Sequence, residues 1–247
     1  MAVLHQVPGG LFATRFGDPP FEVLALPGWM RTVSDFDQVL EGMSALAVDL
    51  PGFGGAQPPP QTPWSTREYA EALLPLLVSF PTPPLVCGHS FGGRVALQLA
   101  STRSDLIQSL VLTGVPQLIA HPKQPPSMKH RLLRVSRKVG LVSDRRMEAW
   151  RRNHGSSDYR NAVGVMRDVL VKAVNENYEE QLCSLRVPTT FVWGELDTAA
   201  PLADARRALE MTPIGVGSLQ VLEGVGHLTP TEAPHSIASA IRSRITG

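Results

Sequence analysis

Short apolar runs alternate with amphipathic stretches along most of the chain. Several of the runs are almost continuously apolar, which is typical of strands covered on both faces of a parallel sheet. Alternating strands and helices predict an α/β fold, a doubly wound sheet whose ligands bind at the carboxyl ends of the strands. The pattern predicts seven strands, at residues 11–16, 22–26, 45–50, 85–88, 109–113, 189–193 and 219–222.

Helix-start signals separate these strands. Ser65 and Glu68 have the spacing of a capping box, in which the hydroxyl and the carboxylate satisfy free amides at the first turn of a helix. A helix at residues 94–101 follows directly from the strand at 85–88. Pro201 suits the first turn of another helix, and residues 236–245 close the chain with a helical period.

Residues 116–185 break this rhythm, because the strand signal disappears and helix-like segments take its place. We interpret this stretch as a helical cap, or lid, inserted over the strand ends. The core domain would then comprise residues 1–115 and 186–247. One apolar stripe at helical spacing supports the helical interpretation, formed by Met166, Val169, Leu170, Ala173 and Val174.

The segment GHSFGG at residues 88–93 follows an apolar strand and precedes a helix. A Gly-x-Ser-x-Gly pattern in this context indicates a nucleophilic serine on a sharp strand-to-helix turn. Gly88 and Gly92 leave room for the close approach of the backbone, and the helix start favours a developing negative charge near Ser90. The alternative is a glycine-rich turn with an incidental serine.

A serine hydroxyl needs a base, and His227 is the best candidate among seven histidines. It follows the last predicted strand, in GVGH at residues 224–227, and so lies at the carboxyl edge of the sheet. His89 should point away from the neighbouring serine. We expect structural or surface roles for the other six, which are His5, His89, His121, His130, His154 and His235.

The acid of a triad should lie on a strand end between the serine and the histidine. Asp197 follows the strand at 189–193 and a glycine turn, and would fix the tautomer of His227. Glu195 is the rival, and we favour Asp197. No histidine or cysteine pair has the spacing of metal ligands, so we predict no metal and no cofactor.

An oxyanion hole requires backbone amides near the serine. The Phe91 amide follows from the turn itself. The second donor should come from the loop after the strand at 22–26, where Pro27 has no N–H and Trp29 is the best candidate. Met30, on the same loop, is a candidate for substrate binding. Trp29 packing only in the core is the alternative.

Together these segments resemble the α/β-hydrolase superfamily, in the order serine, acid, histidine. The landmarks are LPGW (26–29), DLPGFG (49–54), GHSFGG (88–93), WGELD (193–197) and GVGH (224–227). The resemblance implies a mostly parallel, eight-stranded sheet with helices on both faces and a cap after the sixth strand. It departs from the family at Pro27, where many members have histidine. Ser90 distinguishes the chain from the haloalkane dehalogenases and epoxide hydrolases, which have aspartate there.

The resemblance leaves the reaction open. The leading expectation is hydrolysis of a small carboxylic ester or thioester through an acyl-enzyme on Ser90. Arg94 resembles the arginine of menaquinone-pathway lyases, which grip carboxylates, although a helix-packing salt bridge is the favoured role for it. A menaquinone-type lyase, a C–C bond hydrolase and a non-catalytic binding protein on the same scaffold remain alternatives.

Composition narrows the class of protein further. Hydrophobic residues make up 43% and charged residues 18% of the 247 residues, a balance typical of globular domains. A net charge of +1 argues against nucleic acid as a partner. No apolar run suits a membrane helix, and the first residues lack the pattern of a secretory signal. Two separate cysteines, Cys87 and Cys183, predict reduced thiols and a cytoplasmic location.

Charge is unevenly distributed along the chain. Residues 121–160 hold 11 Lys and Arg but only 3 Asp and Glu, so the rest of the chain is net acidic. Arginines of this stretch, among them Arg145 and Arg152, could draw an anionic ester toward the site, whereas a solvated helix face is the alternative. The oligomeric state has no signature in the sequence.

Overall fold

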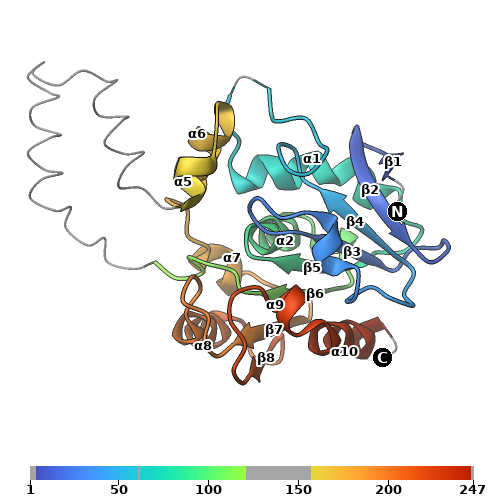
Figure 1. Cartoon of the computed structure of the whole chain (residues 1–247). Helices are drawn as coiled ribbons and strands as arrows, with labels where there is room; N and C mark the ends of the chain where they lie inside the picture. The colour runs from blue at the N-terminus through green and yellow to red at the C-terminus, as the bar shows by residue number, and fades with distance from the viewer. Residues whose placement is uncertain (1–3, 61, 121–156, 246–247) are drawn as a thin grey trace, which may run out of the picture.

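The computed structural model of the chain describes residues 4–60, 62–120 and 157–245. Its centre is an eight-stranded sheet with the strand order β1-β2-β4-β3-β5-β6-β7-β8 (Figure 1). β2 pairs antiparallel with both β1 and β4, and all other neighbouring pairs are parallel. The strands are β1 (Leu4–Val7), β2 (Leu11–Phe16), β3 (Val23–Leu26), β4 (Ala45–Asp49), β5 (Leu85–His89), β6 (Ser109–Thr113), β7 (Thr189–Gly194) and β8 (Gly217–Leu222).

From β3 onward, each connection between strands contains a helix, and two more helices follow β8. The described α-helices are α1 (Thr66–Val78), α2 (Phe91–Thr102), α5 (Ser157–Asn161), α6 (Val165–Ala173), α7 (Glu179–Cys183), α8 (Leu202–Met211), α9 (Thr229–Glu232) and α10 (Pro234–Ile245). Two short 3₁₀ helices, η1 (Val33–Phe36) and η2 (Ser104–Leu106), follow β3 and α2.

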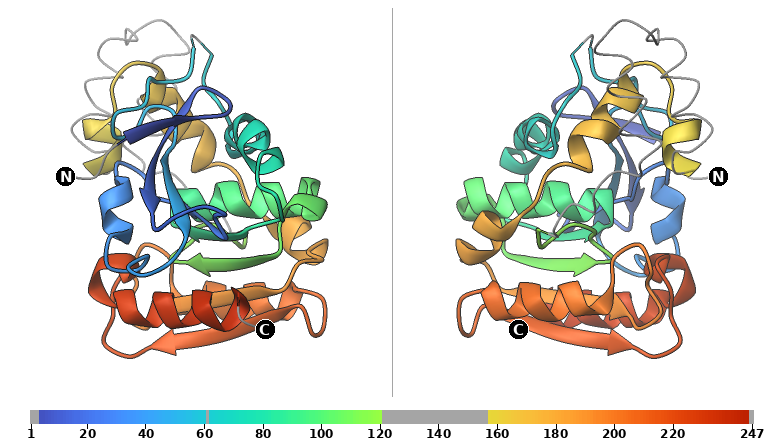
Figure 2. Two further views of the ribbon diagram at one scale, coloured as in Figure 1. Left: turned by 90° about the vertical axis from the view of Figure 1, so that its right-hand side faces the viewer. Right: turned by 90° about the vertical axis from the view of Figure 1, so that its left-hand side faces the viewer.

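Each face of the sheet has its own hydrophobic core. On one face, side chains such as Leu24 and Val86 pack with α1, α2, α7 and α8. On the other face, Ala25 and Cys87 pack with η1 and α10. Figure 2 shows the consequence at one end of the sheet, where α8 (orange) and α10 (dark red) cover opposite sides. Coverage of both faces explains why the central strands are almost continuously apolar.

All seven predicted strands are present, and the sheet has the eight strands that the family resemblance implies. The strand missing from the sequence prediction is β1, a short edge strand with the sequence LHQV. The capping box at the start of α1 is confirmed, with both reciprocal hydrogen bonds between Ser65 and Glu68 in place. Pro201 is the N-cap residue of α8 rather than a member of its first turn.

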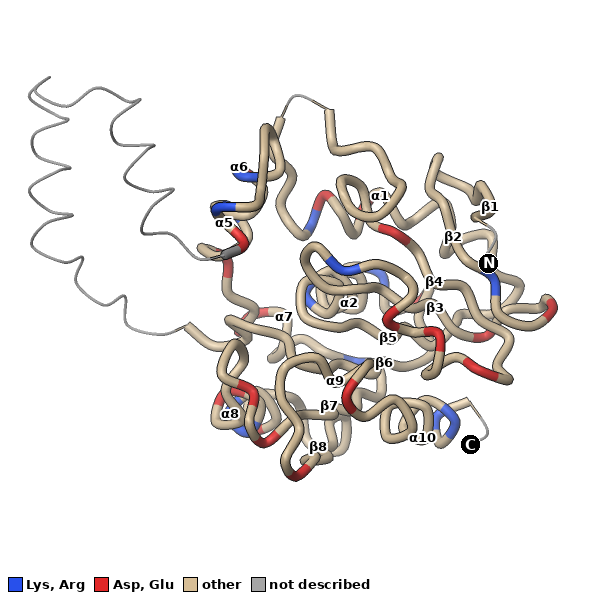
Figure 3. Tube along the Cα trace, viewed as in Figure 1, with Lys and Arg blue, Asp and Glu red and all other residues tan. Residues whose placement is uncertain are grey.

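The chain between β6 and β7 contains α5, α6 and α7, and residues 121–156 of it lie outside the described residues. Most of the predicted basic stretch, including Arg145 and Arg152, therefore has no structural description. In the described part of the chain, Asp and Glu outnumber Lys and Arg (Figure 3).

Polar contacts hold the segment of α6 and α7 against α1 and α2. The Glu176 carboxylate accepts hydrogen bonds from the Thr66 hydroxyl (2.6 Å) and the Tyr178 hydroxyl (2.9 Å). Arg94 on α2 donates to the carbonyl oxygens of Pro116 (3.1 Å) and Ala173 (3.0 Å). Pro116 and Ala173 lie on either side of the undescribed segment, and Arg94 holds both against the core. Loss of these bonds would leave a buried guanidinium unpaired, which is costly.

Neither cysteine forms a disulfide; Cys87 is buried in β5 and Cys183 is exposed on α7. Among the described residues, no helix combines the length and the apolar composition that crossing a bilayer requires.

Candidate active site

The turn between β5 and α2 presents Ser90 at the carboxyl edge of the sheet. Ser90 has φ 51° and ψ −112°, a conformation that side-chain-bearing residues rarely adopt and that is held by the surrounding packing. A Cβ at Gly92 would lie 2.1 Å from the Leu26 carbonyl oxygen, and one at Gly88 would lie 2.6 Å from the Cα of Gly93. Any larger residue at either position would therefore push the turn apart.

His227 reaches Ser90 from the loop between β8 and α9. Its Nε2 lies 3.1 Å from the Ser90 Oγ, and its Nδ1 lies 2.8 Å from the Asp197 Oδ2. A carboxylate only accepts, so Nδ1 carries the proton and Nε2 offers a lone pair to the serine hydroxyl. The Asp197 side chain is fully buried, whereas the His227 side chain is 25% exposed. The three predicted residues therefore form one hydrogen-bonded chain that is open to solvent at the imidazole.

Four further hydrogen bonds hold Asp197 and the residues on either side of His227 in place. The Asp197 Oδ1 accepts from the amides of Ala199 (2.9 Å) and Ala200 (2.7 Å), which fixes the carboxylate. Glu232 accepts from the amides of Gly226 (2.6 Å) and Leu228 (3.2 Å), which flank His227. Glu232 was not predicted from the sequence, although it follows His227 by only five residues.

Glu195, the rival acid, lies in a different position. Its carboxylate accepts from the Gly224 amide (3.2 Å) and thereby fastens the start of the loop that carries His227. It is Asp197, and not Glu195, that contacts the imidazole in the structure.

The loop after β3 passes directly beside the serine. A Cβ at Gly28 would lie 3.2 Å from the Cβ of Ser90, so the Trp29 amide, one residue further on, lies close to the nucleophile turn. The Trp29 ring packs edge-on against Phe91 (5.3 Å) and Phe53 (4.9 Å). The Trp29 ring can therefore pack against these aromatic residues while its main-chain amide remains available as a hydrogen-bond donor. Met30 has φ 53° and is 51% exposed on the same loop.

Arg94 is buried and donates to main-chain carbonyls rather than to a carboxylate. This bonding favours a structural role over the predicted contact with substrate. Arg94 holds main-chain segments together through hydrogen bonds to their carbonyl oxygens, and not through the salt bridge expected from the sequence.

Comparison with known proteins agrees with this architecture. The family model described as "Alpha/beta hydrolase family" matches residues 23–240, which is most of the chain and includes the serine, the acid and the histidine. The chain belongs to the alpha/beta hydrolase family.

Relatives of this alpha/beta hydrolase include named esterases. An esterase of Mycobacterium tuberculosis is 36% identical over 110 residues, which cover 43% of this chain and 37% of that protein. The chain thus matches little more than a third of that relative. A pimeloyl-acyl-carrier-protein methyl ester esterase of Aeromonas salmonicida is 24% identical over 258 residues, covering 92% of this chain and 96% of that protein.

Solved structures show the same fold. A thermophilic esterase from Thermogutta terrifontis superposes with a TM-score of 0.70 at 22% sequence identity, over 100% of this chain and 98% of that chain. At this level of identity the likeness establishes the fold of this alpha/beta hydrolase and nothing of its substrate.

His89 is the main contact of the site that the sequence analysis missed. Its ring is buried behind the nucleophile turn, and its Nε2 lies 2.9 Å from the carbonyl oxygen of His227. A carbonyl only accepts, so Nε2 must donate, and Nδ1 is left as an unprotonated nitrogen. Burial, and to a smaller extent the neighbouring His227, lowers the pKa of His89 to about 4. His89 is therefore a neutral donor that joins the loop carrying His227 to the turn carrying Ser90.

The remaining histidines take no part in this arrangement as far as the described residues show. His235 is exposed on α10 and His5 lies on the edge strand β1, while His121, His130 and His154 lie outside the described residues. In the described part of the chain, no three His, Cys, Asp or Glu side chains are grouped as metal ligands.

The low pKa of His89 predicts a pH-dependent stability. Between pH 6.5 and 4 the unfolded chain binds a proton at His89 that the folded chain does not, so the free energy of unfolding decreases as the pH falls through this range. His89→Gln keeps a donor but cannot titrate, and it should reduce this decrease by up to about 1.4 kcal/mol per pH unit. Urea unfolding across this range measures the two slopes.

His235→Gln supplies the control, because His235 is exposed to solvent in the folded chain. It should keep the wild-type slope. Equal slopes for wild type and His89→Gln would contradict a neutral, buried His89.

Proposed function

We propose that this alpha/beta hydrolase cleaves small carboxylic esters or thioesters through an acyl-enzyme on Ser90. The observation that carries the proposal is the unbroken chain of hydrogen bonds from Ser90 through His227 to Asp197, at 3.1 and 2.8 Å. These distances are within the reach that nucleophile, base and acid require. The esterase names of several relatives support an ester as the substrate class.

In the first half-reaction the Ser90 Oγ attacks the carbonyl carbon of the ester and its proton passes to the His227 Nε2. The Phe91 and Trp29 amides stabilise the negative charge that develops on the carbonyl oxygen, assisted by the start of α2. His227 then gives its proton to the leaving oxygen or sulfur as that bond breaks. Buried Asp197 stabilises the imidazolium throughout.

In the second half-reaction water attacks the acyl carbon and transfers a proton to the His227 Nε2. The bond to Ser90 breaks, the Oγ recovers that proton, and the carboxylic acid leaves. The chain's own residues supply every proton transfer, so the mechanism requires no cofactor.

Residues 116–185 would act as the cap that shapes the substrate pocket, with residues 1–115 and 186–247 forming the core. Contacts of α6 support this division. Met166 fills the space over Gly52, where a Cβ would meet its sulfur at 2.2 Å, and Phe53 beside it contacts Trp29. Helix α6, the described part of this proposed cap that carries Met166, therefore packs next to the loop that approaches Ser90.

A fluorophosphonate probe tests the activated serine. Wild-type protein should be labelled at Ser90, as mapped by mass spectrometry of the tryptic peptide, because only a base-assisted hydroxyl reacts at a useful rate. Ser218→Ala, which removes an exposed serine of β8, should be labelled to the same extent. A well-folded protein that resists labelling would instead support a non-catalytic binding protein.

A further inference from the structure

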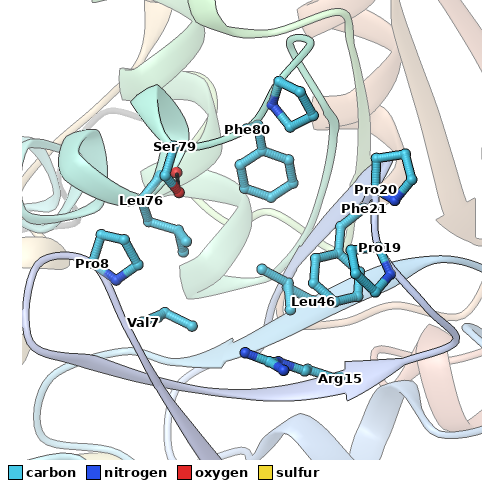
Figure 4. A pocket seen from close by; sticks show the side chains of 11 residues that line it. Val7, Pro8, Arg15, Pro19, Pro20, Phe21, Leu46, Leu76, Ser79 and Phe80 are labelled. Carbon is cyan, nitrogen blue, oxygen red and sulfur yellow. Dashed lines mark hydrogen bonds between the residues drawn. The ribbon is translucent and has the colours of Figure 1, made fainter.

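A cavity of about 410 Å³ lies at the amino ends of the parallel strands, opposite the end at which Ser90 lies. Figure 4 shows the side chains that line it. Leu46, near the start of β4, forms part of its wall, and Phe80 and Pro81 lie just before the start of β5. Ser90 follows the other end of β5. The cavity therefore lies at the amino ends of the parallel strands, separate from the proposed ester site at their carboxyl ends.

The walls of this cavity are apolar and largely fixed in shape. Phe21 and Phe80 are half-buried rings packed against the core, and Leu46 and Leu76, which are almost fully buried, also line the cavity. Prolines have a restricted backbone, so a rim that is rich in them keeps its form without a ligand. Those that line the cavity are Pro8, Pro19, Pro20 and Pro81. The volume falls within the range of about 300–1,000 Å³ that small-molecule sites occupy.

Arg15 is the one charged residue among those that line the cavity. Its guanidinium lies over the Phe21 ring, 6.0 Å from the ring centroid, which orients it along the wall. Within the described residues, no carboxylate forms an ion pair with Arg15. The Ser79 hydroxyl donates a hydrogen bond to the Leu76 carbonyl oxygen (2.7 Å) within its own helix end. The cavity thus combines apolar walls with one cation that has no acidic partner in the described part of the chain.

We propose that this cavity binds a small carboxylate with an apolar chain. Arg15 would pair with the carboxylate through its planar fork of donors, and the chain would lie between Phe21, Phe80 and Leu46. Charge complementarity favours one anionic group, and the volume favours a short chain over a full-length lipid. The proposal is independent of the reaction at Ser90.

Octanoate is a suitable probe, measured by isothermal titration calorimetry on the full chain. Arg15→Met keeps an apolar side chain but removes the charge, and it should weaken octanoate binding about tenfold, the loss expected for one charge-assisted contact. Arg67→Met removes an exposed arginine that pairs with Glu71 and should leave the affinity unchanged. Octanol, a neutral ligand of the same length, should bind wild type and Arg15→Met equally.

Thermal unfolding of each variant checks that the fold is intact, and ester hydrolysis by Arg15→Met should equal that of wild type. The proposal is overturned if octanoate does not bind wild type, or if Arg15→Met and wild type bind it equally. A loss of the same size in Arg67→Met would also overturn it, because it would indicate general charge attraction.

Discussion

Replacing Ser90 with alanine is expected to lower the turnover of a short-chain aryl ester by about 10⁶-fold. The expectation rests on the hydrogen bond between the Ser90 Oγ and the His227 Nε2, since without the hydroxyl no acyl-enzyme forms. Steady-state hydrolysis of the ester, followed by absorbance of the released phenol, measures the loss. The residual rate should come from the oxyanion amides and substrate binding alone.

Ser218→Ala serves as the control for this measurement, as it does for labelling, and should retain wild-type turnover. Hydrolysis by Ser90→Ala at the wild-type rate would remove the proposed mechanism altogether. Ester hydrolysis and octanoate binding at the cavity beside Arg15 are measured independently, so failure of one proposal leaves the other testable.

The second large effect is expected for Asp197→Asn, with turnover reduced about 10⁴-fold. The Asp197 carboxylate accepts the proton on the His227 Nδ1 and so leaves Nε2 free to act as base. An amide NH₂ at this position would favour the other tautomer, with Nε2 protonated and unable to accept the serine proton. The ester assay measures turnover, and circular dichroism confirms the fold.

Glu195→Gln is the matched control, because it neutralises a carboxylate two residues away whose hydrogen bond is to the Gly224 amide, at the start of the loop that carries His227. A neutral side-chain oxygen can still accept from that amide, so we expect less than a tenfold change. A greater loss in Glu195→Gln than in Asp197→Asn would reverse the assignment of the acid.

Much of this fold was predictable because its signals are local. Continuous apolar runs mark the central strands, which are buried on both faces, and the glycines around Ser90 mark a turn that excludes side chains. Strand β1 escaped prediction because LHQV is short and half polar, and it is held in place by pairing with β2. Its stability comes from a partner strand and leaves little trace in its own sequence.

The parts of the site missed by sequence reasoning depend on distant contacts. His89 bonds a carbonyl 138 residues further along the chain, and any donor of similar length would satisfy that carbonyl. Arg94 illustrates the same limit. Its charge suggested a carboxylate partner, yet its partners are main-chain carbonyls, which every residue type offers. Sequence patterns identify reactive side chains better than they identify the groups that hold them.

The separation of the serine from its base also affects the folding chain. Ser90 and His227 are 137 residues apart, and the acid and base arrive only with β7 and β8, the last two strands of the sheet. An incompletely folded chain with six strands has the serine turn but neither of its activating partners. Under the proposed mechanism, Ser90 therefore gains its base and its acid only when β7 and β8 join the sheet.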